Sequence, residues 1–81
     1  MQQIKIKLYG NELVVSRDQY CMAKAKQMVE FGYAGITAGH VDKQIVAVLA
    51  RQKFGDGLDI IGKFMEGEVL AVVDEVDGIK L

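Results

Sequence analysis

The sequence predicts an α+β fold: an N-terminal β-hairpin, an antiparallel helix pair, a short third helix and a C-terminal strand. Three observations predict it. Apolar and polar residues alternate near the N-terminus, helix-capping residues stand at Ser16 and Thr37, and an apolar run rich in valine lies near the C-terminus. A chain of 81 residues is close to the lower limit for a self-supporting core. We therefore expect a single small α+β domain over residues 1–81.

The hairpin is predicted from the alternation in residues 4–9, where isoleucine and leucine alternate with lysine and tyrosine. This is the pattern of a strand with one buried face. Residues 10–12, Gly-Asn-Glu, are predicted to form the turn, because Gly and Asn tolerate positive φ. Residues 13–15, Leu-Val-Val, then form the second strand.

The first helix is predicted to begin at Ser16, whose hydroxyl can accept from the backbone of Gln19 while the Gln19 side chain reaches back. Apolar residues at helical spacing follow, and Gly32 suits the left-handed residue that ends a helix. The apolar stripe consists of Tyr20, Cys21, Ala23, Ala25, Met28, Val29 and Phe31.

The second helix is predicted to begin after Thr37 and to run through Gln52, ending before the glycines that follow Phe54. Its apolar face comprises Val41, Ile45, Val48 and Leu49. Because the connection at residues 33–36 is short, the two helices should pack antiparallel.

Residues 58–76 fit either a helical stripe or a helix followed by a strand. Gly62 and Gly67 argue against one long helix, since each costs roughly 1 kcal/mol inside a helix. We expect a short helix over Leu58–Glu66 and a strand over Val69–Val73 that joins the N-terminal hairpin. Asp77-Gly78 is a signal for a further hairpin turn.

Composition favours a protein that associates with others. Hydrophobic residues make up 51% of the chain, and a domain this small has little interior in which to bury them. We expect a protein partner and a homo-oligomer, most simply a dimer. The single cysteine excludes an internal disulfide and favours a cytoplasmic location. No signal peptide and no membrane-spanning stretch is expected.

Charge is unevenly distributed along the chain. The overall charge is −1, but residues 1–26 carry +3 and residues 27–81 carry −4. Such a layout can present an acidic face to a basic partner. The predicted partner-binding residues are Glu66, Glu68, Asp74, Glu75 and Asp77.

The sequence offers few groups for catalysis, so we expect no enzyme, no cofactor and no metal site. Cys21 and His40 are the only residues of their kinds, and a thiolate–imidazole pair would need them to meet. Zinc sites built from Cys and His require more ligands than these. The simpler interpretation is a buried Cys21 and an exposed first-turn His40.

Two functions remain open from the sequence. The first is a non-enzymatic protein-interaction module that covers a partner, such as a nucleic-acid-binding factor, through its acidic face. In size, lack of proline and acidic tail the chain is similar in style to small phage-encoded inhibitors of host factors, without a shared motif. The alternative is a small dimeric DNA-binding regulator resembling helix-turn-helix proteins, with the second helix in a major groove. Its DNA-contacting residues would be Lys43, Gln44, Arg51 and Lys53.

Overall fold

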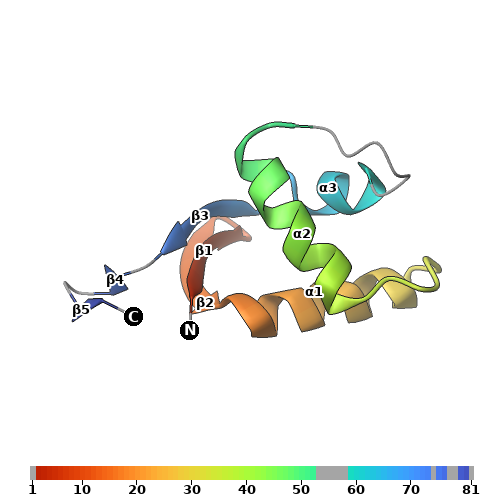
Figure 1. The fold of residues 1–81 in the computed structure, drawn as a ribbon, viewed down its shortest axis with the longest axis horizontal. Coiled ribbons are helices and arrows are strands. Elements are labelled where there is room, and N and C mark those ends of the chain that lie inside the picture. Colours follow the sequence, from red (N-terminus) through yellow and green to blue (C-terminus); the bar gives the residue numbers. More distant parts are fainter. Residues whose placement is uncertain (1, 53–58, 74, 77–78, 81) are drawn as a thin grey trace.

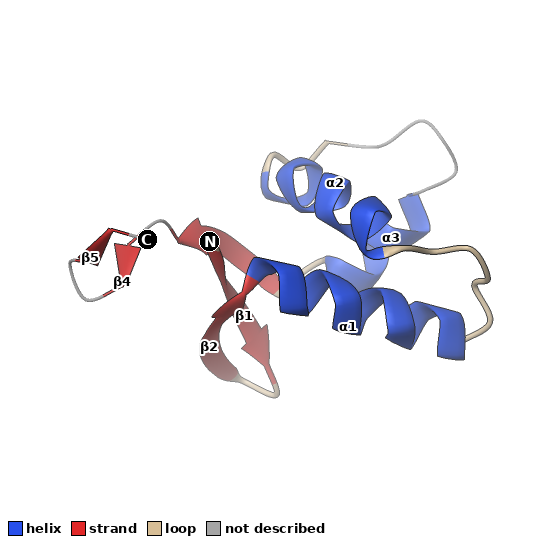
Figure 2. Ribbon diagram, turned by 60° about the horizontal axis from the view of Figure 1, so that its bottom comes forward, coloured by secondary structure: helices blue, strands red, loops and turns tan. Residues whose placement is uncertain are grey.

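The computed structural model describes residues 2–52, 59–73, 75–76 and 79–80 and has the predicted α+β architecture. The three helices lie on one side of a three-stranded antiparallel sheet, and a small two-stranded hairpin projects beyond the sheet (Figures 1 and 2). The elements are, in order, β1 (Gln3–Leu8), β2 (Asn11–Ser16), α1 (Arg17–Glu30), α2 (Ala38–Leu49), α3 (Asp59–Met65), β3 (Val69–Val73), β4 (Glu75–Val76) and β5 (Ile79–Lys80).

The sheet has the strand order β2-β1-β3, so β1 is central and pairs antiparallel with both neighbours. The turn begins one residue earlier and ends two residues earlier than the predicted residues 10–12. Its two loop residues are Tyr9 and Gly10, with φ of 50° and 82°, while Asn11 and Glu12 belong to β2. Positive φ at both positions is the geometry of a type I′ turn, whose twist matches that of the strands. The error came from assigning the left-handed position to Asn11, when Tyr9 occupies it.

Helix α1 begins as predicted, with the Ser16 hydroxyl accepting from the Gln19 backbone at 3.4 Å. Its last residue is Glu30 and its C-cap is Phe31, and Gly32 has φ of 101°, as predicted for the residue that stops a helix. The aromatic rings of Phe31 and Tyr33 contact Phe64 of α3, with ring centroids 5.8 and 5.6 Å away. The corner between α1 and α2 is therefore fixed by the third helix.

Helix α2 begins as predicted at the Thr37 cap, and the cap is reciprocal. The Thr37 hydroxyl accepts from the His40 backbone, and the Thr37 backbone donates to Nδ1 of His40 at 3.1 Å. The helix ends at Leu49, earlier than predicted. Arg51 has φ of 54°, which lies in the left-handed region and is incompatible with a helix continuing to Gln52.

In the C-terminal third, the structure has the predicted short helix followed by the predicted strand. Helix α3 ends at Met65, and β3 pairs with β1 on the side opposite β2. Strands β4 and β5 form the hairpin indicated by Asp77-Gly78, although both turn residues lie outside the described part of the chain.

The core lies where α1, α2, α3 and the inner sheet face meet. Ile4 and Ile6 of β1 supply the sheet side, because alternate residues of a strand point to the same face. The predicted face of α2 is confirmed, with Val41 and Ile45 fully buried. The predicted stripe of α1 is confirmed only in part, because Tyr20, Cys21, Ala25 and Met28 are buried but Ala23, Val29 and Phe31 are exposed.

Candidate functional site

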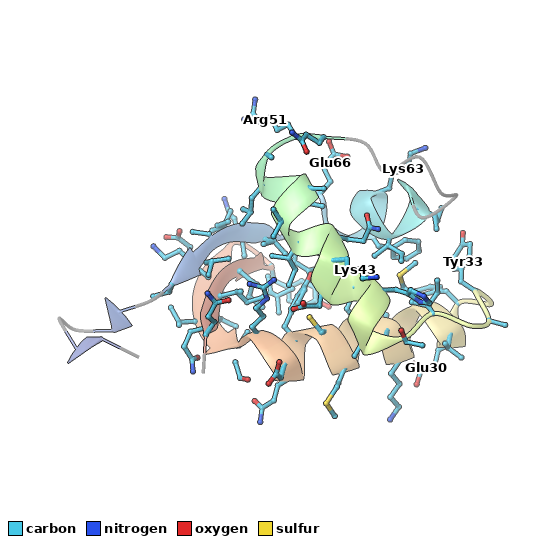
Figure 3. The ribbon with its side chains drawn as sticks, viewed as in Figure 1. Glu30, Tyr33, Lys43, Arg51, Lys63 and Glu66 are labelled. Atoms are coloured by element: carbon cyan, nitrogen blue, oxygen red, sulfur yellow. The ribbon has the colours of Figure 1, made fainter. Side chains whose placement is uncertain are left out.

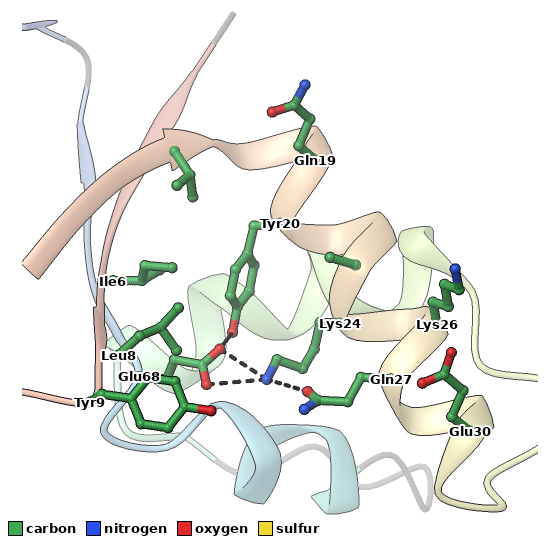
Figure 4. A pocket seen from close by; sticks show the side chains of 12 residues that line it. Ile6, Leu8, Tyr9, Gln19, Tyr20, Lys24, Lys26, Gln27, Glu30 and Glu68 are labelled. Carbon is green, nitrogen blue, oxygen red and sulfur yellow. Dashed lines mark hydrogen bonds and ion pairs between the residues drawn. The ribbon is translucent and has the colours of Figure 1, made fainter. Parts of the chain in front are cut away.

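An open groove lies between the β1–β2 hairpin and α1, and we call it the hairpin groove (Figure 4). Its volume is about 670 Å³, within the range of roughly 300–1,000 Å³ common for ligand sites. One wall is the inner face of the hairpin and the other is one side of α1. The lining residues are Ile6, Leu8, Tyr9, Val15, Gln19, Tyr20, Ala23, Lys24, Lys26, Gln27, Glu30 and Glu68.

A polar network within the groove ties α1 to the turn before β3 (Figure 4). The Tyr20 hydroxyl donates to Glu68 Oε1 at 2.7 Å, and Lys24 Nζ lies 2.9 Å from the same oxygen. Lys24 also donates to Gln27 Oε1 at 2.8 Å. The side chains of Lys24 and Glu68 are only 8% and 19% exposed. Because each buried charge has its partner, the network holds two distant segments together.

The Tyr20 phenol in this network is kept protonated. Burial raises its pKa above the ordinary value of 10.0, and the hydrogen bond and negative charge of Glu68 raise it further. A phenol that holds its proton at neutral pH serves as a hydrogen-bond donor and not as a base. Tyr20 therefore has a positioning role toward Glu68.

A second polar cluster joins the first turn of α1 to α2. Arg17 Nε donates to Asp42 Oδ1 at 2.7 Å, and the buried Cys21 thiol donates to the same oxygen at 3.7 Å. Burial, followed by the charge and hydrogen bond of Asp42, raises the pKa of Cys21 from 9.0 to about 11. The thiol is thus protonated at neutral pH, which is the opposite of what a nucleophilic cysteine requires.

The structure gives Cys21 and His40 separate structural contacts. The Cys21 thiol bonds to Asp42, and the His40 imidazole closes the cap of α2 through its Nδ1 atom. Nδ1 accepts the Thr37 amide hydrogen there, so this ring nitrogen is engaged within the cap. Among the described residues, no group of three or more His, Cys, Asp or Glu side chains could hold a metal ion.

The predicted acidic residues do not all lie on one exposed face. Glu66 is exposed (Figure 3) and lines a second hollow of about 390 Å³ beside the hairpin groove, together with Lys7 and Tyr9. Glu68 lines both hollows, but its carboxylate is engaged by Tyr20 and Lys24. Glu75 lies on β4, while Asp74 and Asp77 lie outside the described residues.

Only some of the predicted DNA-contacting residues are exposed. Lys43 and Arg51 are exposed and are drawn in Figure 3. Gln44 is 0% exposed, and neither its Nε2 nor its Oε1 has a hydrogen-bond partner in the described part of the chain. A side chain at that position cannot reach a base edge. Lys53 lies outside the described residues.

Sequence reasoning missed Tyr20 and Lys24 as members of a polar network. The signal was present, because Lys24 stands four residues from both Tyr20 and Met28, on the apolar side of α1. A lysine in that position needs a buried partner. Its partner, Glu68, is distant in sequence, and only the folded sheet brings the two together.

Comparisons of the chain with protein families, with curated proteins and with solved structures gave no match. No helix in the described residues is long and apolar enough to cross a membrane. What the protein does must therefore be inferred from its own residues.

Proposed function

We propose that this protein is a non-enzymatic interaction module that binds a basic protein partner along the hairpin groove and the adjoining hollow with Glu66. The partner could be a nucleic-acid-binding factor, as a phage-type inhibitor would require. The observation that carries the proposal is the groove with its adjoining hollow, which combine apolar walls with the exposed Glu66, although Lys7 and Lys26 also line them.

Exposed apolar side chains around the groove support a protein partner over a small metabolite. Tyr9 at the tip of the hairpin is fully exposed, and Leu13 is 45% exposed. Aromatic residues on an exposed rim are common anchors at protein interfaces, because they bury a large area at little entropic cost. An open groove with such a rim suits an inserted segment of a partner.

The acidic residues would select the partner by charge. Glu66 is exposed, and Glu75 lies on β4, at the far end of β3 from Glu66 (Figures 1 and 3). Glu68 contributes differently, since its carboxylate already accepts from Tyr20 and Lys24. We therefore assign partner contact to Glu66, Glu75, Asp74 and Asp77, and assign Glu68 to the stability of the groove.

The candidate nucleophiles and bases support a non-catalytic role, because each one near the groove or at α2 has a structural task. Tyr20 holds Glu68, Cys21 bonds to Asp42, and His40 caps α2. In the groove, the raised pKa of Tyr20 disfavours its use as a nucleophile or a base.

The test is capture of a partner from cells by the immobilised chain, followed by binding measurements with the isolated partner. Replacing Glu66 and Glu75 by lysine should weaken binding strongly. The matched control reverses Glu12 and Asp18, two exposed acids that line neither hollow, and should bind nearly as wild type. Equal loss in both double variants would show a general charge effect and remove the acidic segment from the mechanism.

The same preparation tests the DNA-binding alternative, which retains Lys43 and Arg51 as exposed basic residues. Phosphate contacts are strong at low salt and weaken steeply as salt rises. Fluorescence polarisation with mixed-sequence duplex at about 50 mM salt should show no binding. A salt-sensitive signal that falls in a Lys43→Ala, Arg51→Ala variant would favour the regulator instead.

A further inference from the structure

The outer edge of β2 carries backbone groups that no described residue pairs. Strand β2 stands at the end of the sheet order and pairs over its whole length with β1 alone. The Arg17 backbone donates to the carbonyl of Gln2, which makes these two residues a hydrogen-bonded pair. Hydrogen-bonded pairs alternate with non-hydrogen-bonded pairs along an antiparallel ladder. It follows that the backbone N–H and C=O groups of Leu13 and Val15 bond to β1, while those of Glu12 and Val14 point away from β1.

Most of the usual protections of an edge strand are missing from β2, whose one charged residue is Glu12. Its sequence, Asn-Glu-Leu-Val-Val-Ser, has no proline and no lysine, and its register with β1 is free of bulges. Leu13 and Val14 are each 45% exposed, although they lie on opposite faces of the sheet. An unprotected edge with exposed apolar residues on both faces is a template for another strand.

The sequence of β2 matches a second copy of itself. We infer that two copies of this chain pair antiparallel through β2, about a two-fold axis at Val14, to form one continuous sheet. This register places Val14 opposite Val14 on the outer face and Leu13 opposite Val15 on the inner face. It also places Glu12 opposite Ser16. Apolar residues therefore face apolar residues and the acidic side chains avoid each other, which is favourable for cross-strand pairs.

Other registers are less favourable. Centring the axis on Leu13 places Glu12 opposite Val14, and centring it on Glu12 places two carboxylates together. The Val14-centred register also uses every outward backbone group of Glu12 and Val14. A closed two-fold pairing of this kind satisfies both edges at once and does not continue into a fibre.

This inference specifies the self-association that accompanies the proposed function. It rests on the backbone edge of β2 and on Val14 of the outer face, whereas Leu13 and Val15 of the inner face adjoin the hairpin groove assigned to the partner. Val14→Glu provides a selective test. Val14 and Ala71 both lie opposite Lys5, from the two sides of β1. A new carboxylate at either position can pair with Lys5 within one chain. Only the carboxylate at position 14 would face the same carboxylate of the second copy across the proposed two-fold axis.

Sedimentation velocity over a range of concentrations should show a monomer–dimer equilibrium for the wild-type chain. Val14→Glu should weaken dimerisation by about tenfold or more, while Ala71→Glu should leave it unchanged. Mixing Val14→Glu with Val14→Lys should restore the dimer, because opposite charges then face each other. Circular dichroism verifies that each variant is folded.

Amide hydrogen exchange gives an independent measurement. The amides of Glu12 and Val14 should gain protection as concentration rises, whereas those of Leu13 and Val15 should be protected throughout. A monomer at every concentration, or a dimer lost in Ala71→Glu and retained in Val14→Glu, would overturn the inference. A monomeric Val14→Glu chain that still binds its partner would separate this interface from the proposed function.

Discussion

Replacing Gln44 by methionine should stabilise the protein. The side chain is fully buried on α2, and both of its amide atoms lack a hydrogen-bond partner in the described part of the chain. Burying an amide without a partner costs about 1–3 kcal/mol in mutational data. Methionine has a similar length and is flexible enough to occupy the same space without that cost. We expect a gain of about 2 kcal/mol in the free energy of unfolding.

A gain of this size is large for so small a domain. The total free energy of unfolding should be on the order of 4–12 kcal/mol, and a change of 2 kcal/mol corresponds to an increase in Tm of roughly 8–16 °C. Thermal and urea unfolding followed by circular dichroism measure both quantities. Gln52→Met is the matched control, because Gln52 is exposed and its replacement should change stability little.

The reasoning would be refuted if Gln44→Met were no more stable than the wild-type chain. The amide would then have a favourable partner in solution, such as a buried water molecule. Gln44→Ala separates polarity from size, because it removes the amide but leaves a cavity. It should be less stable than Gln44→Met by a few kcal/mol, which is the usual cost of such a cavity.

Three further outcomes follow from the structure. Lys24→Met leaves a largely buried carboxylate unpaired and should cost about 3 kcal/mol in urea unfolding, whereas Lys26→Met, on an exposed lysine of the same groove, should cost little. Because the folded-state pKa of Cys21 is raised from 9.0 to about 11, its contribution to stability is present below pH 9 and is lost as pH rises from 9 to 11. Alkylation of the native thiol should therefore be slow at pH 7 and should accelerate between pH 9 and 11. Fast alkylation at pH 7 would contradict the burial of Cys21. Gly32→Ala should destabilise by about 1 kcal/mol because φ is 101°, whereas Gly62→Ala in α3 meets only an ordinary contact and should stabilise by about 0.5–1 kcal/mol.

The local elements of this fold were predictable because their signals are local. Ser16 and Thr37 cap the helices as expected, and Gly32 ends α1. The hairpin turn was misplaced because Tyr9 accepts a left-handed conformation that sequence reasoning assigns to Gly or Asn. Helix α2 was predicted too long, since nothing in the residue pattern indicated the left-handed Arg51.

The candidate site was less predictable because its contacts are long-range. Glu68 looked like part of an acidic surface, but β3 pairing with β1 brings it to Tyr20 and Lys24. Gln44 looked like a polar residue on an exposed helix face, yet it is buried in the packed helices. In both cases the sequence indicated a polar residue and only the tertiary structure determined what surrounds it.

The measurement that bears most directly on the function is the affinity of the captured partner for the wild-type chain, titrated calorimetrically at increasing salt. If the protein acts by binding a basic partner along the hairpin groove and Glu66, binding should be stoichiometric and should weaken as salt screens the charges. It should fall in the Glu66→Lys chain but not in Asp18→Lys, since Asp18 is exposed and lines neither hollow. Salt-independent binding that is equal in all three chains would contradict the account, as would chemical conversion of the partner by the protein.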